Sequence, residues 1–176
     1  LAVNRAFHGI VLLGKIRCRV GQRDRAEFRT VRRLDLHLEF APYEIKYLDE
    51  DILILAGDIS PNRNDVVTLV KNYLSQNDKV LVLFILGNHD YYKSTISDTI
   101  SFYKNLAIPR FYFLQDDSMV INGIRFFGAT LWTDLEGVYD KEIEFMIKDF
   151  WTIKDFSAMT FKSLHKTSKN ALQKTF

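Results

Sequence analysis

Two uninterrupted runs of apolar residues stand near the middle of this chain. Residues 52–56 read Ile-Leu-Ile-Leu-Ala and residues 80–86 read Val-Leu-Val-Leu-Phe-Ile-Leu, with no polar position in either run. Aliphatic residues without polar alternation are typical of strands that are covered on both faces, as in a parallel sheet. The pattern therefore predicts two buried strands over these ranges.

The segment between the two runs has the spacing of an amphipathic helix. Its apolar positions fall on one helical face, and they are Val66, Val67, Leu69, Val70, Tyr73 and Leu74. Asn62 or Asn64 is suited to cap the start of this helix. Strand, helix and strand in this order predict a βαβ unit with a parallel strand pair.

The later part of the chain predicts shorter elements. These are helices over residues 95–106, 140–150 and 156–172, and strands over residues 111–114, 119–121 and 124–127. Between the last two strands stands Asn122-Gly123, a pair that favours a two-residue hairpin turn. Helices alternating with strands predict an α/β fold.

Composition fits one soluble domain but shows an uneven charge. The chain has 176 residues, of which 47% are hydrophobic and 26% charged, so it can bury a core. The net charge of +2 combines +7 on residues 1–33 with −5 on the remainder. Residues 28–34 also make a poor central strand. We predict that residues 1–33 are a basic lead outside the fold and that residues 34–176 form one domain.

Cysteine usage and hydropathy bear on the compartment. Cys18 is the single cysteine of the sequence, which excludes an internal disulfide framework and fits a reducing environment. The apolar run Ile10–Leu13 is far shorter than the roughly 20 residues of a membrane span. We predict a cytoplasmic protein without membrane contact.

Side chains that can bind metal ions stand in three clusters: Asp35-Leu36-His37, Gly57-Asp58 and Gly87-Asn88-His89-Asp90. In an extended segment the first and third residues of the first cluster would point to one side. The other two clusters directly follow the predicted strands, and the carboxyl ends of parallel strands are where open α/β sheets bind ligands. Taken singly, each cluster has an ordinary explanation as a polar turn or a surface pair.

Taken together, the three clusters resemble the pattern D-x-H, G-D and G-N-H-[DE] of the calcineurin-like metallophosphoesterases. From Asp35 to about Phe176 the chain is similar to bacterial and phage members, including the stretch Phe-Gly-Ala-Thr-Leu-Trp-Thr-Asp at residues 127–134. The resemblance implies an α/β/β/α sandwich, with two sheets packed face to face between helices. It also implies a phosphoric ester hydrolase (a phosphatase or phosphodiesterase) with a dinuclear metal centre and a bridging hydroxide.

The same resemblance implies a ligand set. Asp35 and His37 would bind the first metal, Asp58 would bridge both metals, and Asn88 would bind the second. These mixed ligands suit two divalent ions, Mn²⁺, Fe or Zn²⁺, without selecting among them.

The catalytic residues implied by the resemblance are His89 and Asp90. His89 would lie beside the substrate phosphate, as proton donor or as stabiliser of developing charge, and Asp90 would support it. The substrate implied is a phosphoester, which leaves monoesters, diesters and nucleotides open.

The sequence departs from the family pattern after the third cluster. The family continues with further histidines, including a G-H-x-H motif, whereas His165 is the one histidine that follows His89 here. We therefore expect a fragment, a partial sandwich whose carboxyl-terminal strands are missing, with well under two metals per chain and little hydrolysis. The alternatives are a non-catalytic remnant or binding domain, and a nuclease or nucleotide phosphodiesterase of the same superfamily. The basic lead is the feature that would favour contact with nucleic acid.

Overall fold

The computed structural model describes residues 9–15, 29–33, 35–134 and 140–176. Its strands are β1 (Gly9–Lys15), β2 (Thr30–Arg33), β3 (Ile52–Ala56), β4 (Leu81–Ile85), β5 (Phe111–Phe113), β6 (Asp117–Ile121) and β7 (Ile124–Thr130). Its helices are α1 (Arg63–Leu74), the short 3-10 helix η1 (His89–Tyr91), α2 (Ile96–Lys104), α3 (Asp140–Met146), α4 (Asp149–Thr152) and α5 (Ala158–Thr175).

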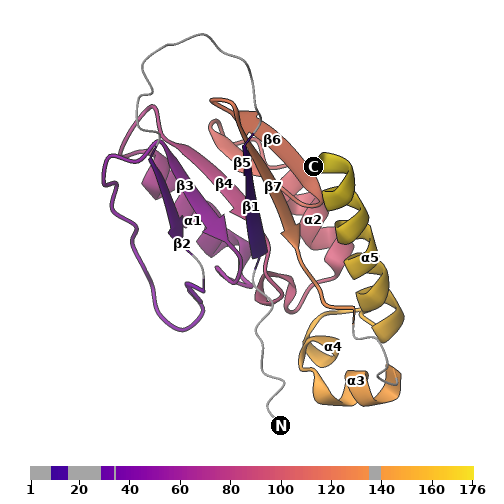
Figure 1. Ribbon diagram of the computed structural model, residues 1–176. Coiled ribbons are helices and arrows are strands. Elements are labelled where there is room, and N and C mark those ends of the chain that lie inside the picture. The colour runs from indigo at the N-terminus through magenta and orange to yellow at the C-terminus, as the bar shows by residue number, and fades with distance from the viewer. Residues whose placement is uncertain (1–8, 16–28, 34, 135–139) are drawn as a thin grey trace.

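Four parallel strands form the first sheet, in the order β2-β3-β4-β5. The two predicted buried strands are its centre, and they pair in parallel with Ala56 opposite Ile85. All four strands run towards the lower edge of the molecule in Figure 1. Their carboxyl ends, and the loops that follow them, therefore meet at one edge.

Three antiparallel strands form the second sheet, in the order β1-β7-β6. The turn between β6 and β7 is made by Asn122 and Gly123, whose φ angles are 49° and 75°. Two left-handed residues in succession match the right-handed twist of a hairpin, which is why Asn-Gly is favoured there. The predicted hairpin is confirmed.

The two sheets pack face to face. On β3, Ile52 and Ile54 belong to the same buried cluster as Phe126 of the second sheet, whereas Leu53 and Leu55 belong to the core formed with α1 and α2. This alternation explains the apolar run, because both faces of the strand are covered. Helix α5 lies along β6 and β7 (Figure 1). The predicted α/β fold of a partial α/β/β/α sandwich is confirmed.

Two strands within residues 1–33 pair with the sheets, although we predicted that this range lies outside the fold. Within this range β1 pairs with β7 over Gly9–Lys15, and β2 pairs with β3 over Thr30–Arg33. The apolar run Ile10–Leu13 is what a sheet strand requires, although its length excludes a membrane span. The arginine-rich β2 is tolerated because it is an edge strand. Strand pairing therefore begins before residue 34, while residues 1–8 and 16–28 lie outside the described residues.

The helices begin where capping residues predict. Asn62 caps α1 by accepting the N–H of Asn64 at 3.1 Å, and Thr95 caps α2 by accepting the N–H of Asp98 at 3.0 Å. The predicted helix over residues 140–150 is divided into α3 and α4. No helix in the described part of the chain has both the length and the hydrophobicity that a membrane span requires.

Candidate metal centre

The three motif clusters meet at the carboxyl edge of the parallel sheet. The segment after β2 runs beside the loop after β3, because Asp35 donates its backbone N–H to Gly57 O at 3.1 Å and His37 donates to Asp58 O at 3.1 Å. The loop after β4 joins them, since His89 donates its backbone N–H to Asp58 Oδ1 at 3.0 Å. Parallel pairing of β2 with β3 and of β3 with β4 thus places all three clusters together.

Three predicted metal ligands have their ligand atoms within 4.8 Å of one another: Asp35, His37 and Asp58. The extended backbone assumed for the first cluster was wrong, because Asp35 and His37 have φ angles of 54° and 46°. Asp58 is also left-handed, with φ of 53°. Left-handed non-glycine residues are uncommon and gather at functional sites, where neighbouring structure holds the strain. Backbone twist, and not strand alternation, brings these side chains together.

Asp90 joins two of the loops from inside the protein. Its side chain is 1% exposed, and its carboxylate accepts the backbone N–H groups of Asp58, Ile59 and Ser60 at 2.9 Å each and of Gly87 at 2.8 Å. These four bonds fix the loop after β3 against the loop after β4.

This arrangement differs from the support of His89 that the resemblance implies. Every hydrogen bond described for the Asp90 side chain goes to backbone N–H groups, so the carboxylate acts on the loops and not on the imidazole ring. Asp90 is therefore placed to position the loops that carry the candidate metal ligands.

The two carboxyl groups of Asp58 and Asp90 share a buried region. Burial, and then the charge of Asp58, raises the pKa of Asp90 to about 7, although its backbone hydrogen bonds favour the charged form. Burial also raises the pKa of Asp58, against the opposing effect of the N–H bond from His89. Negative charge is unfavourable here in the protein alone, and a bound cation would relieve it.

Asn88 is 5% exposed and has one side-chain atom without a hydrogen bond. Its amide nitrogen donates to Asp149 Oδ1 at 2.9 Å and to the Tyr92 hydroxyl at 3.4 Å. Its carbonyl oxygen accepts no hydrogen bond from any residue that the structure describes. A buried oxygen in this condition is unusual, and the amide carbonyl is the atom that binds cations. The donor set therefore fits a second cation.

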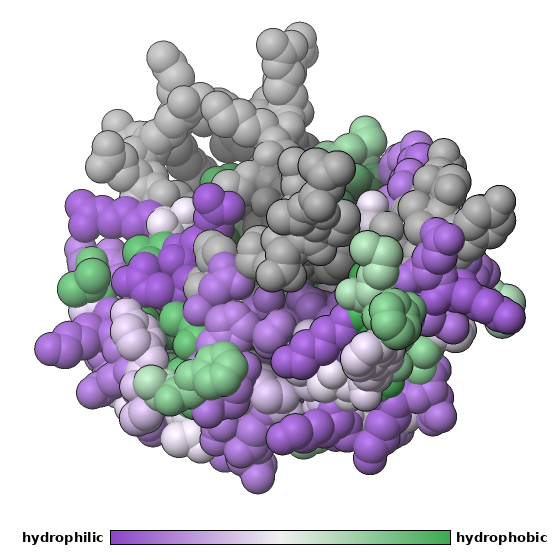
Figure 2. All heavy atoms as spheres, turned by 90° about the horizontal axis from the view of Figure 1, so that it is seen from below, coloured by the Kyte–Doolittle hydropathy of each residue, from purple (hydrophilic) through white to green (hydrophobic). Residues whose placement is uncertain are grey.

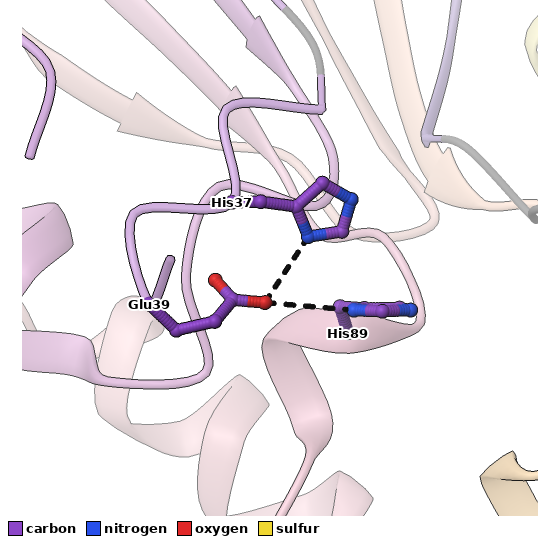
Figure 3. A group of neighbouring side chains, drawn as sticks. All are labelled: His37, Glu39 and His89. Carbon is purple, nitrogen blue, oxygen red and sulfur yellow. Dashed lines mark hydrogen bonds and ion pairs between the residues drawn. The ribbon is translucent and has the colours of Figure 1, made fainter. Parts of the chain in front are cut away.

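Figure 3 shows a third carboxylate, Glu39, between the two histidines of the motifs. Its Oε1 lies 3.1 Å from Nδ1 of His37 and 3.7 Å from Nδ1 of His89. The two imidazole rings meet edge to face, with centroids 4.7 Å apart. Glu39 therefore lies on the Nδ1 side of both rings. The three ligand atoms also lie within 4.8 Å of one another, close enough to hold a metal ion themselves.

His165 lies elsewhere. Its Nδ1 contacts the carbonyl oxygen of Trp132, which ties α5 to the segment that follows β7. The groups of closely spaced ligands found among the described residues do not include His165. Within the described part of the chain, this histidine therefore has a structural role.

Two residues of the site were missed in the sequence, Glu39 and Asp149. Glu39 stands two positions after His37, so an acidic residue close to the first cluster was its only signal. Asp149 is separated from Asn88 by 61 positions and belongs to no motif. Only the three-dimensional structure shows that Asp149 lies beside Asn88.

The candidate site is open to solvent at this end of the molecule. Figure 2 views the molecule from the end at which the parallel strands finish, and the visible coloured surface is mainly hydrophilic with separate hydrophobic residues. Side chains of His37, Glu39 and His89 are 27%, 22% and 25% exposed, so they are accessible from solvent. A cavity of about 480 Å³ lies nearby between residues 38–45 and α1, but none of the predicted ligands lines it.

Comparison with known proteins agrees with this geometry. The family model for the calcineurin-like phosphoesterases matches residues 26–167. An "Uncharacterized protein L509" of Acanthamoeba polyphaga mimivirus is 26% identical over 159 residues, which cover 77% of this chain and 56% of that protein. The chain thus spans about half the length of this relative. No solved structure matches the chain. With a match over most of its length, the chain belongs to the calcineurin-like phosphoesterase family.

Proposed function

We propose that this protein hydrolyses phosphoester bonds with the help of two divalent metal ions. The observation that carries the proposal is the convergence of Asp35, His37 and Asp58 within 4.8 Å, at the sheet edge that also holds Asn88 and His89. Family membership supports the reaction class, and the set of donor atoms supports a metal-dependent mechanism.

The residues divide into two ligand groups. Asp35 and His37 would hold the first cation, Asp58 would be shared, and the carbonyl oxygen of Asn88 would serve the second. Two such cations, when bound, would supply a hydroxide nucleophile and neutralise charge on the phosphoryl oxygens of the substrate. Mn²⁺, Fe and Zn²⁺ all accept this mixture of carboxylate, imidazole and amide ligands.

His89 is the proposed catalytic residue of the protein itself. Its ring is one-quarter exposed, and Glu39 lies on its Nδ1 side. Its Nε2 would donate a proton to the leaving oxygen or hydrogen-bond a phosphoryl oxygen. Glu39 would keep the ring in that orientation, and Asp90 would keep the loop of His89 against the loop of Asp58. Glu39 and Asp90 are then positioning residues.

Hydrolysis of p-nitrophenyl phosphate and of bis(p-nitrophenyl) phosphate tests the proposal. Protein stripped with a chelator should be inactive, and added Mn²⁺ should restore slow hydrolysis of one or both esters. Asp58→Asn should remove that activity, while Asp78→Asn, a change of an exposed residue on the loop before β4, should keep it. Hydrolysis that survives in Asp58→Asn would contradict the proposal. Mn²⁺ binding without any hydrolysis would favour the alternative of a non-catalytic binding domain.

A further inference from the structure

Asp149 begins helix α4, far in sequence from the motifs, yet its side chain reaches the candidate metal centre. The residue is 3% exposed, and its Oδ1 accepts hydrogen bonds from the amide nitrogen of Asn88 at 2.9 Å and from the Tyr92 hydroxyl at 2.7 Å. Both partners belong to the loop and turn that follow β4. A carboxylate only accepts hydrogen bonds, so the Asn88 atom facing it must be the nitrogen.

We propose that Asp149 is a positioning residue of the metal centre, which holds the Asn88 carbonyl oxygen available as a ligand and fixes Tyr92 against His89. This inference rests on the proposed function, because it assigns a role within the same site. Without Asp149, the Asn88 amide would be free to turn and present its NH₂ group to a cation. An NH₂ group repels a cation, whereas the carbonyl oxygen binds it.

Tyr92 extends the effect to the proposed proton donor. Its ring stacks on the His89 ring with centroids 4.3 Å apart and an interplanar angle of 29°. The ammonium group of Lys148 lies 5.8 Å from the centre of the Tyr92 ring. One buried carboxylate thus orients both a proposed metal ligand and the neighbour of the proposed acid.

The helix that carries Asp149 is itself fixed to the site. Lys93 donates its backbone N–H to Thr152 O at 2.9 Å, and Lys154 donates to Ser94 O at 2.9 Å. These bonds attach the end of α4 to the segment directly after Tyr92. Because both sides of the contact are held by backbone, the Asp149 carboxylate is preorganised for Asn88 and Tyr92.

Direct binding of a metal by Asp149 is the main alternative role. The close groups of ligand atoms found among the described residues contain Asp35, His37, Glu39, Asp58 and His89, and Asp149 belongs to neither group. Its Oδ1 already accepts two hydrogen bonds. The geometry therefore favours action through Asn88.

Titration with Mn²⁺ by calorimetry, together with electron paramagnetic resonance of the loaded protein, tests the inference without measuring hydrolysis. Asp149→Leu keeps the branched shape of the side chain and removes the acceptor, with some added volume. It should weaken binding of the second ion by about 10–100-fold, as is usual for residues that orient metal ligands. The first ion should bind within about twofold of its original affinity, because an effect confined to Asn88 spares Asp35 and His37. Glu142→Gln, an exposed change on the neighbouring α3, is the matched control and should alter neither affinity.

An exchange of the two partners separates positioning from a merely structural role. Asn88→Asp places two carboxylates face to face and should also weaken the second ion. Adding Asp149→Asn restores a donor opposite an acceptor, so the double variant should recover affinity relative to Asn88→Asp alone. A double variant no better than that single change, or an unchanged second affinity in Asp149→Leu, would overturn the inference.

Two further outcomes keep the test decisive. If Asp149→Leu does not fold, Asp149→Ala takes its place, since it also removes the acceptor of the Asn88 amide without adding volume; an unaltered second affinity there would also count against the inference. Wild-type protein that binds no Mn²⁺ would refute the proposed function and this inference with it. Wild-type protein that binds two ions and is unaffected by the Asp149 changes would refute this inference alone.

Discussion

The buried carboxylate of Asp90 lies 2.9 Å from the backbone nitrogen of Asp58, and this hydrogen bond joins the loop after β4 to the loop after β3. Three further backbone N–H groups point at the same carboxylate. A single side chain therefore holds the two loops that carry the proposed bridging ligand and the proposed ligand of the second ion.

Asp90→Ala should destabilise the protein severely. The change leaves four N–H groups without their acceptor in a buried region, and each unsatisfied group costs about 1–3 kcal/mol. Since water can enter the space and satisfy some of them, we expect a loss of about 3 kcal/mol or more in the free energy of unfolding. Urea denaturation measures it, with the exposed change Asp78→Ala as control. A loss below about 1 kcal/mol would show that the loops are held by other contacts.

Two glycines, Gly87 after β4 and Gly128 within β7, should respond differently to substitution by alanine. A Cβ atom at Gly87 would lie 2.2 Å from Oδ1 of Asp58 and 2.6 Å from its backbone nitrogen, so Gly87→Ala should displace Asp58 and abolish metal binding. A Cβ atom at Gly128 would lie 2.5 Å from Leu114 Cβ and 2.6 Å from Ile85 Cγ1. Gly128→Ala should therefore lower the melting temperature through overpacking of the core between the sheets.

Metal analysis separates the two glycine variants. Protein that remains folded should bind Mn²⁺ when it carries Gly128→Ala and should not when it carries Gly87→Ala. Equal binding in both would mean that Gly87 is not required for the approach of Asp58.

The fold was predictable where local pattern and burial agree. The continuous apolar run of β3 and the Asn122-Gly123 turn each have one simple structural solution, and both predictions were confirmed. Strand β1 was not predicted, because its short apolar run gains meaning only from pairing with β7, more than a hundred positions away. Pairing over that distance leaves no local trace in a sequence.

The site was predictable only in part, for a related reason. The second and third clusters follow predicted strands, so strand order was enough to predict that these two would gather at one edge. The place of the first cluster was implied only by the family resemblance. The left-handed backbone of Asp35 and His37 was not predictable, since it depends on bonds to the neighbouring loop. Asp149 could not be found at all, because its partner Asn88 lies in another element and their contact is set by packing.

Metal binding should depend on pH below neutrality. Burial and the charge of Asp58 raise the pKa of Asp90 to about 7, so in metal-free protein this group is mostly protonated at pH 6 and mostly charged at pH 8. A cation at Asp58 opposes the negative charge and lowers the pKa of Asp90, so binding should release protons at pH 6 and few at pH 8. The apparent affinity should accordingly rise with pH and level off above about 7.

Calorimetry of Mn²⁺ binding in buffers with different ionisation enthalpies counts the released protons. Equal release at pH 6 and pH 8, or an affinity that falls as the pH rises from 6 to 7, would contradict the coupling between Asp58 and Asp90.

The roles proposed for Asp58 and His89 predict different losses. Asp58→Ala should remove metal and activity together, since this residue is proposed to serve both ions. His89→Ala should keep the metal content and reduce turnover by about 10²–10⁴-fold, the usual contribution of a general acid. Elemental analysis and steady-state kinetics on the same samples distinguish the two. Equal metal loss in both variants would make His89 a ligand, as the group with His37 and Glu39 also allows.

The two ions should bind with unequal strength. Among the residues that the structure describes, the first ion has three proposed ligands with converging atoms, Asp35, His37 and Asp58, whereas the second has the shared Asp58 and Asn88. Water must complete the coordination of the second ion, and fewer protein ligands mean weaker binding. A Mn²⁺ titration should show one tight site and one weak site, with hydrolysis appearing only as the weak site fills. His165→Ala should leave both affinities unchanged, because its Nδ1 contacts Trp132 O and the residue belongs to neither group of closely spaced ligands found among the described residues. Two tight sites of equal affinity, one of which is lost in His165→Ala, would instead make His165 a ligand of the second ion.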